Sequence, residues 1–159
     1  MPKYGQLTRE ELTALEKEFV EFLVINGVSA DQWKQLKQNS PDKAEGVIEQ
    51  FSDVVWEGVL RKIRFLEFRS KNEIKTFQCL QDKIVLMGLK INKTEVDLSS
   101  EIDYEALRKN PPLTNVYSLE KKYEKNRETE IFEMIENGCF RSDGTLFKQI
   151  ALAVAEKTT

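Results

Sequence analysis

The spacing of apolar residues changes at residue 62, and this change constrains the fold more than any other feature of the sequence. A long segment that begins at Ser40-Pro41 repeats apolar residues at helical spacing, with Ser as N-cap and Pro in the first turn. From Lys62 onward polar and apolar residues alternate, which is typical of a half-buried strand. The chain therefore has to combine a helical layer with a sheet.

Capping signals predict further helices on both sides of the strand region. Thr8 to Glu11 forms a capping box at the start of the first helix, and Asn26-Gly27 ends that helix. Ser29 begins a second helix, which runs to about Gln38. Three more helices are predicted after the strands, over residues 103–109, 127–136 and 144–156.

The alternating segment predicts a three-stranded antiparallel meander. Its first strand runs from Lys62 to Arg69, and short turns separate it from strands over residues 74–80 and 84–91. Gly88 is expected to allow the close approach of another backbone. Residues 96–98 could add a short edge strand, whereas residues 118–126 are too polar to assign. The prediction is an α+β fold with N-terminal helices, this meander and C-terminal helices, in a single domain over residues 1–159.

The chain has no histidine, and this absence excludes several kinds of chemistry. Ser-His-Asp and Cys-His catalysis in their usual forms and zinc sites built on histidine are excluded. No phosphate-binding loop, dinucleotide fingerprint or nucleophile elbow is present. We therefore assign no catalytic, cofactor-binding or metal-binding residue, expect no cofactor, and favour a non-catalytic protein over an enzyme.

The two cysteines, Cys79 and Cys139, lie 60 positions apart in apolar surroundings. That spacing makes neither a metal-ligand motif nor a redox pair, so we expect two buried, reduced thiols. No segment has the apolar length of a transmembrane helix, and the N-terminus lacks the pattern of a signal peptide. These features favour a cytoplasmic protein that does not act on a membrane.

Positive charge is concentrated in the middle of the chain. Residues 61–93 contain 9 basic and 3 acidic residues (net +6), residues 1–60 contain 6 and 11 (net −5), and residues 94–159 contain 9 and 13 (net −4). The acidic flanks can neutralise the middle, or the middle can steer a complementary partner. The candidate interaction surface consists of Arg61, Lys62, Arg64, Arg69, Lys71 and Lys75.

Two polar clusters resemble sites but are better explained by local structure. Glu95, Asp97, Glu101 and Asp103 lie close in sequence, yet they lack the spacing and the glycine of an EF-hand. We interpret them as a solvated acidic loop with Asp103 near a helix start. Residues 142–145, with the sequence SDGT, are interpreted as the N-cap of the last helix.

Three stretches together resemble a known family. They are PKYGQLTREELTALEKEFVEFLVINGVSADQW near the start, FSDVVWEGVLRKIRFLEFRS in the middle, and KKYEKNRETEIFEMIENGC with SDGTLF near the end. In this order they resemble a bacterial domain-of-unknown-function family of small cytosolic proteins of about this length. Some members carry a histidyl-tRNA synthetase label, but this chain is far too short for that enzyme and lacks its ATP-binding motifs. The resemblance implies one real fold and attaches no functional residues.

These observations lead to three hypotheses for function. The first is a protein-protein interaction module whose partner is another protein or a second copy of the chain in a homodimer. The second is an RNA- or ribosome-associated factor that uses the basic strand surface, although an overall pI near 5.3 argues against nucleic acid. The third is an enzyme that uses carboxylates with Mg²⁺, which requires a pocket lined by buried carboxylates.

Overall fold

Helices alone build the first of two units into which the chain divides, residues 1–61. The structure, a computed structural model, describes residues 3–93 and 95–157. The helices of this unit are α1 (Arg9–Ala14), α2 (Glu16–Ile25), α3 (Ala30–Asn39) and α4 (Pro41–Lys62), whose last residue passes into the second unit. That residues 1–159 form a single domain stays a prediction of the sequence.

Capping boxes begin α1 and α3, as the sequence predicts. The side chains of Thr8 and Ser29 accept hydrogen bonds from the third residue of their helices, whose own side chains bond back. The prediction of one helix from Thr8 to Asn26 is wrong, however. The helix breaks at Leu15, whose N–H is shared between the carbonyls of Glu11 and Leu12.

The N-terminal segment before α1 is bound along α4. Asp53 accepts hydrogen bonds from the backbone N–H groups of Lys3 and Tyr4, and the Tyr4 hydroxyl donates to Glu57 over 2.6 Å. Inside the unit, the ring of Phe19 lies edge-on to other rings, with centroids 5.0 Å from Phe51. Ala44, Phe51 and Leu60 of α4 are buried, as its helical spacing indicates. Val54 (57% exposed) and Val59 (41% exposed) are not buried, so only part of the apolar surface of α4 is used as core.

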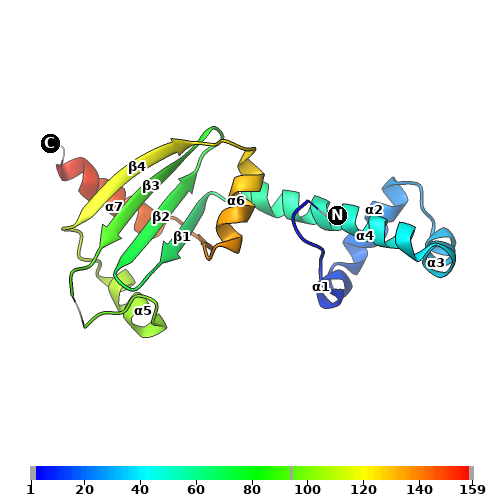
Figure 1. Ribbon diagram of the computed structural model, residues 1–159, viewed down its shortest axis with the longest axis horizontal. Helices are drawn as coiled ribbons and strands as arrows, with labels where there is room; N and C mark the ends of the chain where they lie inside the picture. The colour runs from blue at the N-terminus through cyan, green and yellow to red at the C-terminus, as the bar shows by residue number, and fades with distance from the viewer. Residues whose placement is uncertain (1–2, 94, 158–159) are drawn as a thin grey trace. The chain divides into compact units, whose positions relative to one another are not determined.

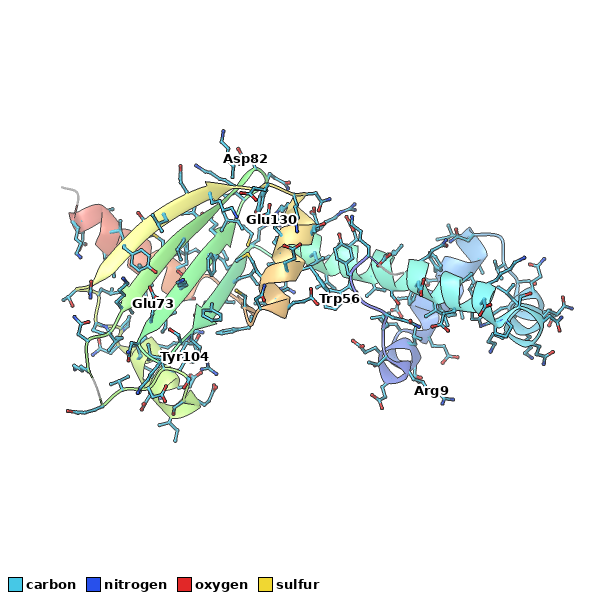
Figure 2. The ribbon with its side chains drawn as sticks, in the orientation of Figure 1. Arg9, Trp56, Glu73, Asp82, Tyr104 and Glu130 are labelled. Carbon is cyan, nitrogen blue, oxygen red and sulfur yellow. The ribbon has the colours of Figure 1, made fainter. Side chains whose placement is uncertain are left out.

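A five-stranded antiparallel sheet organises the second unit, residues 62–159. The strand order is β4-β3-β2-β1-β5 (Figure 1). Glu73 and Asp82 mark the two ends of the β2–β3 hairpin (Figure 2). The elements are β1 (Phe65–Arg69), β2 (Glu73–Cys79), β3 (Lys83–Lys90), α5 (Glu101–Lys109), β4 (Val116–Lys122), α6 (Arg127–Glu136), β5 (Phe140–Ser142) and α7 (Thr145–Lys157).

The α+β class and the antiparallel meander β1–β2–β3 are confirmed, and three details of the prediction are wrong. The first strand begins at Phe65 and not at Lys62, because the helical repeat of α4 continues to that lysine. Residues 96–98 form no strand. The outer strands β4 and β5 were not predicted, since one is largely polar and the other has only three residues.

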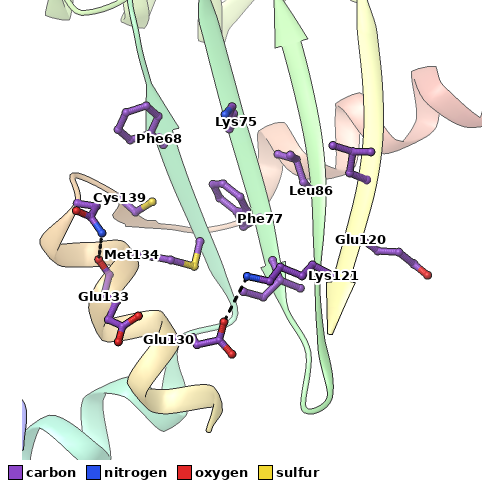
Figure 3. Close-up of a pocket in the computed structure, with 13 residues that line it drawn as sticks. Phe68, Lys75, Phe77, Leu86, Glu120, Lys121, Glu130, Glu133, Met134 and Cys139 are labelled. Atoms are coloured by element: carbon purple, nitrogen blue, oxygen red, sulfur yellow. Dashed lines mark hydrogen bonds and ion pairs between the residues drawn. The ribbon is translucent and has the colours of Figure 1, made fainter. Parts of the chain in front are cut away.

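The two faces of the sheet differ in how they are covered. On the core face, α5 and α7 pack over residues that include Ile74, Leu89 and Val116, and α7 crosses β2, β3 and β4. The opposite face, which we call the groove face, carries Leu66, Phe77 and the residues two positions away from them along each strand, such as Phe68 and Lys75. There α6 lies beside β1, with α7 behind the sheet (Figure 3).

The core face also contains a buried polar cluster. The Glu67 carboxylate, which is 1% exposed, accepts a hydrogen bond from the Tyr104 hydroxyl over 2.8 Å and pairs with Arg108 over 3.5 Å. Burial, together with the hydrogen bond to Glu67, raises the pKa of Tyr104 to about 12. These contacts fix α5 against β1, and partnering of this kind is what a buried carboxylate requires.

Candidate functional site

A row of apolar side chains crosses the groove face from β1 to β4. Direct cross-strand pairing places Leu66 beside Phe77, Phe77 beside Leu86, and Leu86 beside Leu119. Leu66 is 0% exposed, Phe77 and Leu86 are partly buried, and Leu119 is 63% exposed. Cover over this row is therefore lost progressively from β1 towards the edge strand.

The position of α6 explains this gradient, and one buried arginine fixes the start of that helix. The Arg127 guanidinium donates to the carbonyls of Cys79 (3.2 Å) and Leu80 (3.1 Å), at the end of β2. It also donates to the carbonyl of Ile63, just before β1. The Asn126 side chain caps α6, as the sequence predicts. Held at this corner, α6 covers the β1 end of the apolar row.

The uncovered part of the groove face forms a groove of about 660 Å³ between α6 and the sheet (Figure 3). This volume lies in the range of about 300–1,000 Å³ that is usual for ligand pockets. Its apolar lining comes from strands and from α6 and includes Phe68, Phe77, Ile84, Leu86, Leu119 and Met134. A groove with such a lining binds apolar groups by removing them from water.

Most charged side chains around the groove are already paired. Lys121 lies 3.8 Å from Glu130, Lys125 lies 2.6 Å from Glu133, and Lys83 lies 3.2 Å from Glu120.

Lys75 differs from these residues. Its side chain is partly buried in the groove between Phe68 and Leu86, yet its ammonium group forms no hydrogen bond or ion pair within residues 3–93 and 95–157 (Figure 3).

The thiol of Cys139 also lines the groove, and Cys79 lies on the same face of the sheet. Both cysteines are free; Cys79 is buried as predicted, whereas Cys139 is only partly buried. Burial raises the pKa of the Cys139 thiol to about 11, although the positive charge of Lys75 acts in the opposite direction. A neutral thiol of this kind is a weak nucleophile and behaves as a small apolar group.

Gly88 pairs with Lys75 across the strands and leaves room on the groove face for the ring of Tyr117. A β-carbon at Gly88 would lie 2.1 Å from a ring carbon of Tyr117, so only glycine leaves room for this ring to cross β3. The Tyr117 hydroxyl donates to Glu73, and burial with this hydrogen bond raises its pKa. Gly88 thus allows a close approach, as expected, but the approaching group is a side chain and not a backbone.

The six predicted basic residues lie on several different elements. Arg61 and Lys62 lie in α4, Arg64 precedes β1, and Lys71 lies in the turn after it. Arg69 is on the core face, where its guanidinium stacks 4.3 Å from the Tyr104 ring and pairs with Glu101 over 2.7 Å. Lys75 alone of the six lines the groove. Arg69 pairs with Ile74, which precedes Lys75 on β2, and because successive residues of a strand point to opposite faces, Arg69 and Lys75 lie on opposite faces of the sheet.

The acidic residues near Asp97 serve local structure. The Asp103 carboxylate accepts from the backbone N–H of Asp97 over 2.9 Å, and Asp97 in turn accepts from Ser99. Within residues 3–93 and 95–157, no group of Cys, Asp and Glu is arranged to hold a metal ion. Asp143 accepts from the Thr145 N–H at the start of α7, which lowers its pKa and agrees with the predicted cap.

The family of this chain follows from comparison of its sequence with family models. The model of a family of unknown function, DUF6495, matches residues 1–155. The chain belongs to this family. No curated protein and no solved structure matches the chain. No helix formed by the described residues is long and apolar enough to cross a membrane.

Proposed function

We propose that this member of the DUF6495 family is a non-catalytic protein-binding module, and that its groove takes up an apolar segment of a partner protein. The observation that supports the proposal is the apolar row on the groove face, which ends in Leu119 at 63% exposure. Apolar side chains that adjoin one another on a surface commonly mark interaction sites.

The shape of the groove favours a protein segment as occupant. The sheet provides a floor, α6 provides one wall, and the opposite side towards β4 is open. An amphipathic segment can lie in such a groove along its length. The partly buried cation Lys75 adds charge complementarity to a partner that carries an acidic group.

The two other hypotheses have less support. The carboxylates that line the groove are not fully buried; they belong to Glu120, Glu130 and Glu133. The buried Glu67 lies on the core face, where its carboxylate already accepts from Tyr104 and pairs with Arg108. An RNA-binding surface is disfavoured because Arg69 and Lys75, the two predicted cations that lie on strands, are on opposite faces of the sheet.

Photo-cross-linking in the cells that produce the protein tests the proposal. A benzophenone amino acid at Phe77 is expected to form an adduct with one protein, whereas the same probe at Leu152, an exposed residue of α7, is expected to form none. The adduct protein is then purified and titrated against the wild type and against Leu119→Glu. We expect the variant to weaken binding at least about tenfold, since it places a charge in the apolar contact.

Other results would contradict the proposal. An adduct with a second copy of the chain only would make the groove a self-association site. An adduct of small mass would make it a small-molecule site. Equal affinity of wild type and Leu119→Glu for the purified adduct protein would place binding elsewhere.

A further inference from the structure

Uncovered apolar surface and an unpaired cation occur together in the groove, at Leu86 and Lys75. We infer that the partner segment is an amphipathic helix with an acidic side chain that pairs with Lys75. This inference rests on the proposed function and names the chemistry of its partner.

The way in which helices cover the two faces of the sheet supports a helix as the partner segment. On the core face, α7 crosses β2, β3 and β4, and the row Ile74, Leu89, Val116 is buried as far as the edge strand. On the groove face, α6 leaves Leu86 of β3 only partly buried and Leu119 of β4 exposed. A second helix beside α6 would complete this layer, because a sheet face is normally covered by helices packed side by side.

The dimensions of the groove fit a short helix. Lys75 and Cys79 are four residues apart on β2, which is about 13 Å along the strand. About nine residues of helix span that distance. Phe77, Leu86 and Leu119 pair directly across the strands, so they lie at one level midway between the two ends, where apolar residues of the middle turn of the helix would contact them.

The charged side chains at the two ends of the groove indicate which charge the partner helix carries. At the end of the groove near Cys79, Lys121 is already paired with Glu130. At the other end, Lys75 forms no ion pair within the described residues, its cross-strand neighbours are Phe68 and Gly88, and the carboxylate of Glu73 on the same face already accepts from Tyr117. When a bound helix excludes water from this end, a carboxylate on the helix compensates the lost hydration of the ammonium.

An added strand is a weaker alternative. It would have to pair with β4, whose exposed edge carries Glu120, Lys121 and Lys122. Charged side chains on an edge strand oppose pairing with another strand.

Peptide selection against the full chain tests the inference. The probe is a displayed library of helical peptides of about 16 residues, long enough to hold helix when bound, with a fixed apolar stripe and all other positions randomised. Selection is run on wild type, on Lys75→Glu, and on the matched control Lys109→Glu, which reverses an exposed lysine of α5. We expect Asp or Glu at one stripe-flanking position for wild type and control, and Lys or Arg there for Lys75→Glu.

Titration of the selected peptides then measures the pairing. We expect Lys75→Glu to weaken the acidic peptide about tenfold or more, and Lys75→Met to weaken it less, as for a desolvated charge pair. Exchange of the peptide's acidic residue for Lys should restore binding to Lys75→Glu.

The outcomes separate the inference from the function on which it rests. Groove binders that depend on Leu119 but show no charge preference at Lys75 would overturn the inference and leave the protein-binding function standing. A library without groove binders, with tight binding of dodecanoate that Lys75→Met abolishes, would overturn both and assign the groove to anionic amphiphiles.

Discussion

The two faces of the sheet have similar apolar content but different cover. The core-face row of Ile74, Leu89 and Val116 is buried to the edge strand, while the groove-face row ends in exposed Leu119. Both rows lie on the same strands and arise from the same alternation. The difference shows that burial on each face is decided by the position of helices that lie outside the strands.

The helices on both faces bury apolar residues, such as Ile131 in α6 and Ile150 in α7, but α6 also has a polar anchor at its start. On the core face, Leu146 and Ile150 of α7 join the apolar cluster under the sheet. On the groove face, the start of α6 is fixed by hydrogen bonds from Arg127 to backbone carbonyls.

The largest effect is expected from Leu89→Ala, compared with Leu86→Ala on the same strand. Leu89 is fully buried on the core face, so its truncation should lower the free energy of unfolding by about 3 kcal/mol. Leu86, partly buried on the groove face, should cost only about 1 kcal/mol. Urea denaturation of the two variants measures both values, and equal losses would contradict the difference between the faces.

Arg127→Met tests how α6 is held. The substitution removes the donor to three carbonyls and should lower the free energy of unfolding by about 2 kcal/mol. Hydrogen exchange should accelerate most at the amides of α6. Arg141→Met, on exposed β5, is the matched control and should stay within about 0.5 kcal/mol of wild type. Uniform acceleration across both faces would show that Arg127 supports the whole unit and not α6 in particular.

Local signals in the sequence predict the elements well where short-range contacts form them. The caps at Thr8, Ser29, Asn126 and Asp143 all make the predicted type of hydrogen bond. The strand β4 escapes prediction because it is an edge strand with mostly exposed side chains, so its sequence lacks clear alternation. Only its pairing with β3 makes it a strand.

The candidate site depends on contacts between residues far apart in sequence. Lys75 was predicted as part of a basic surface with Arg69, but the register places the two on opposite faces. The groove itself depends on how far α6 extends over the row that ends at Leu119, and no local pattern encodes that extent. The sequence signal that could have indicated the groove is Leu119, the one apolar residue within the polar run of residues 118–122.

Gly88→Ala probes the end of the groove face near Lys75. The new β-carbon would collide with the Tyr117 ring, displace it and separate its hydroxyl from Glu73. We expect a loss of about 1–2 kcal/mol in the free energy of unfolding. In a Tyr117→Ala background the same change should cost nothing or stabilise slightly, because alanine is preferred to glycine in a strand by about 0.5 kcal/mol. Equal costs in both backgrounds would rule out the ring contact as the cause.

The smallest effect concerns Cys139, which leaves the fold intact and reports on the groove. Because burial raises its pKa from 9.0 to about 11 in the folded state, the thiol stays protonated at pH 8. Alkylation by iodoacetamide at pH 8 should then be about 100-fold slower than for the same cysteine in urea, since only the thiolate reacts. By linkage, stability associated with this thiol is complete below about pH 9 and declines as the pH rises towards 11.

Peptide mapping by mass spectrometry follows Cys139 separately from Cys79. Lys75→Met should slow the alkylation of Cys139 further, because the ammonium charge that favours the thiolate is removed. A bound peptide that pairs with Lys75 should slow it in the same direction, both by neutralising that charge and by covering the thiol. Alkylation that is fast in the folded protein, or indifferent to Lys75, would mean that Cys139 does not share the groove with this lysine, and the groove face would lose the charged end on which its proposed specificity depends.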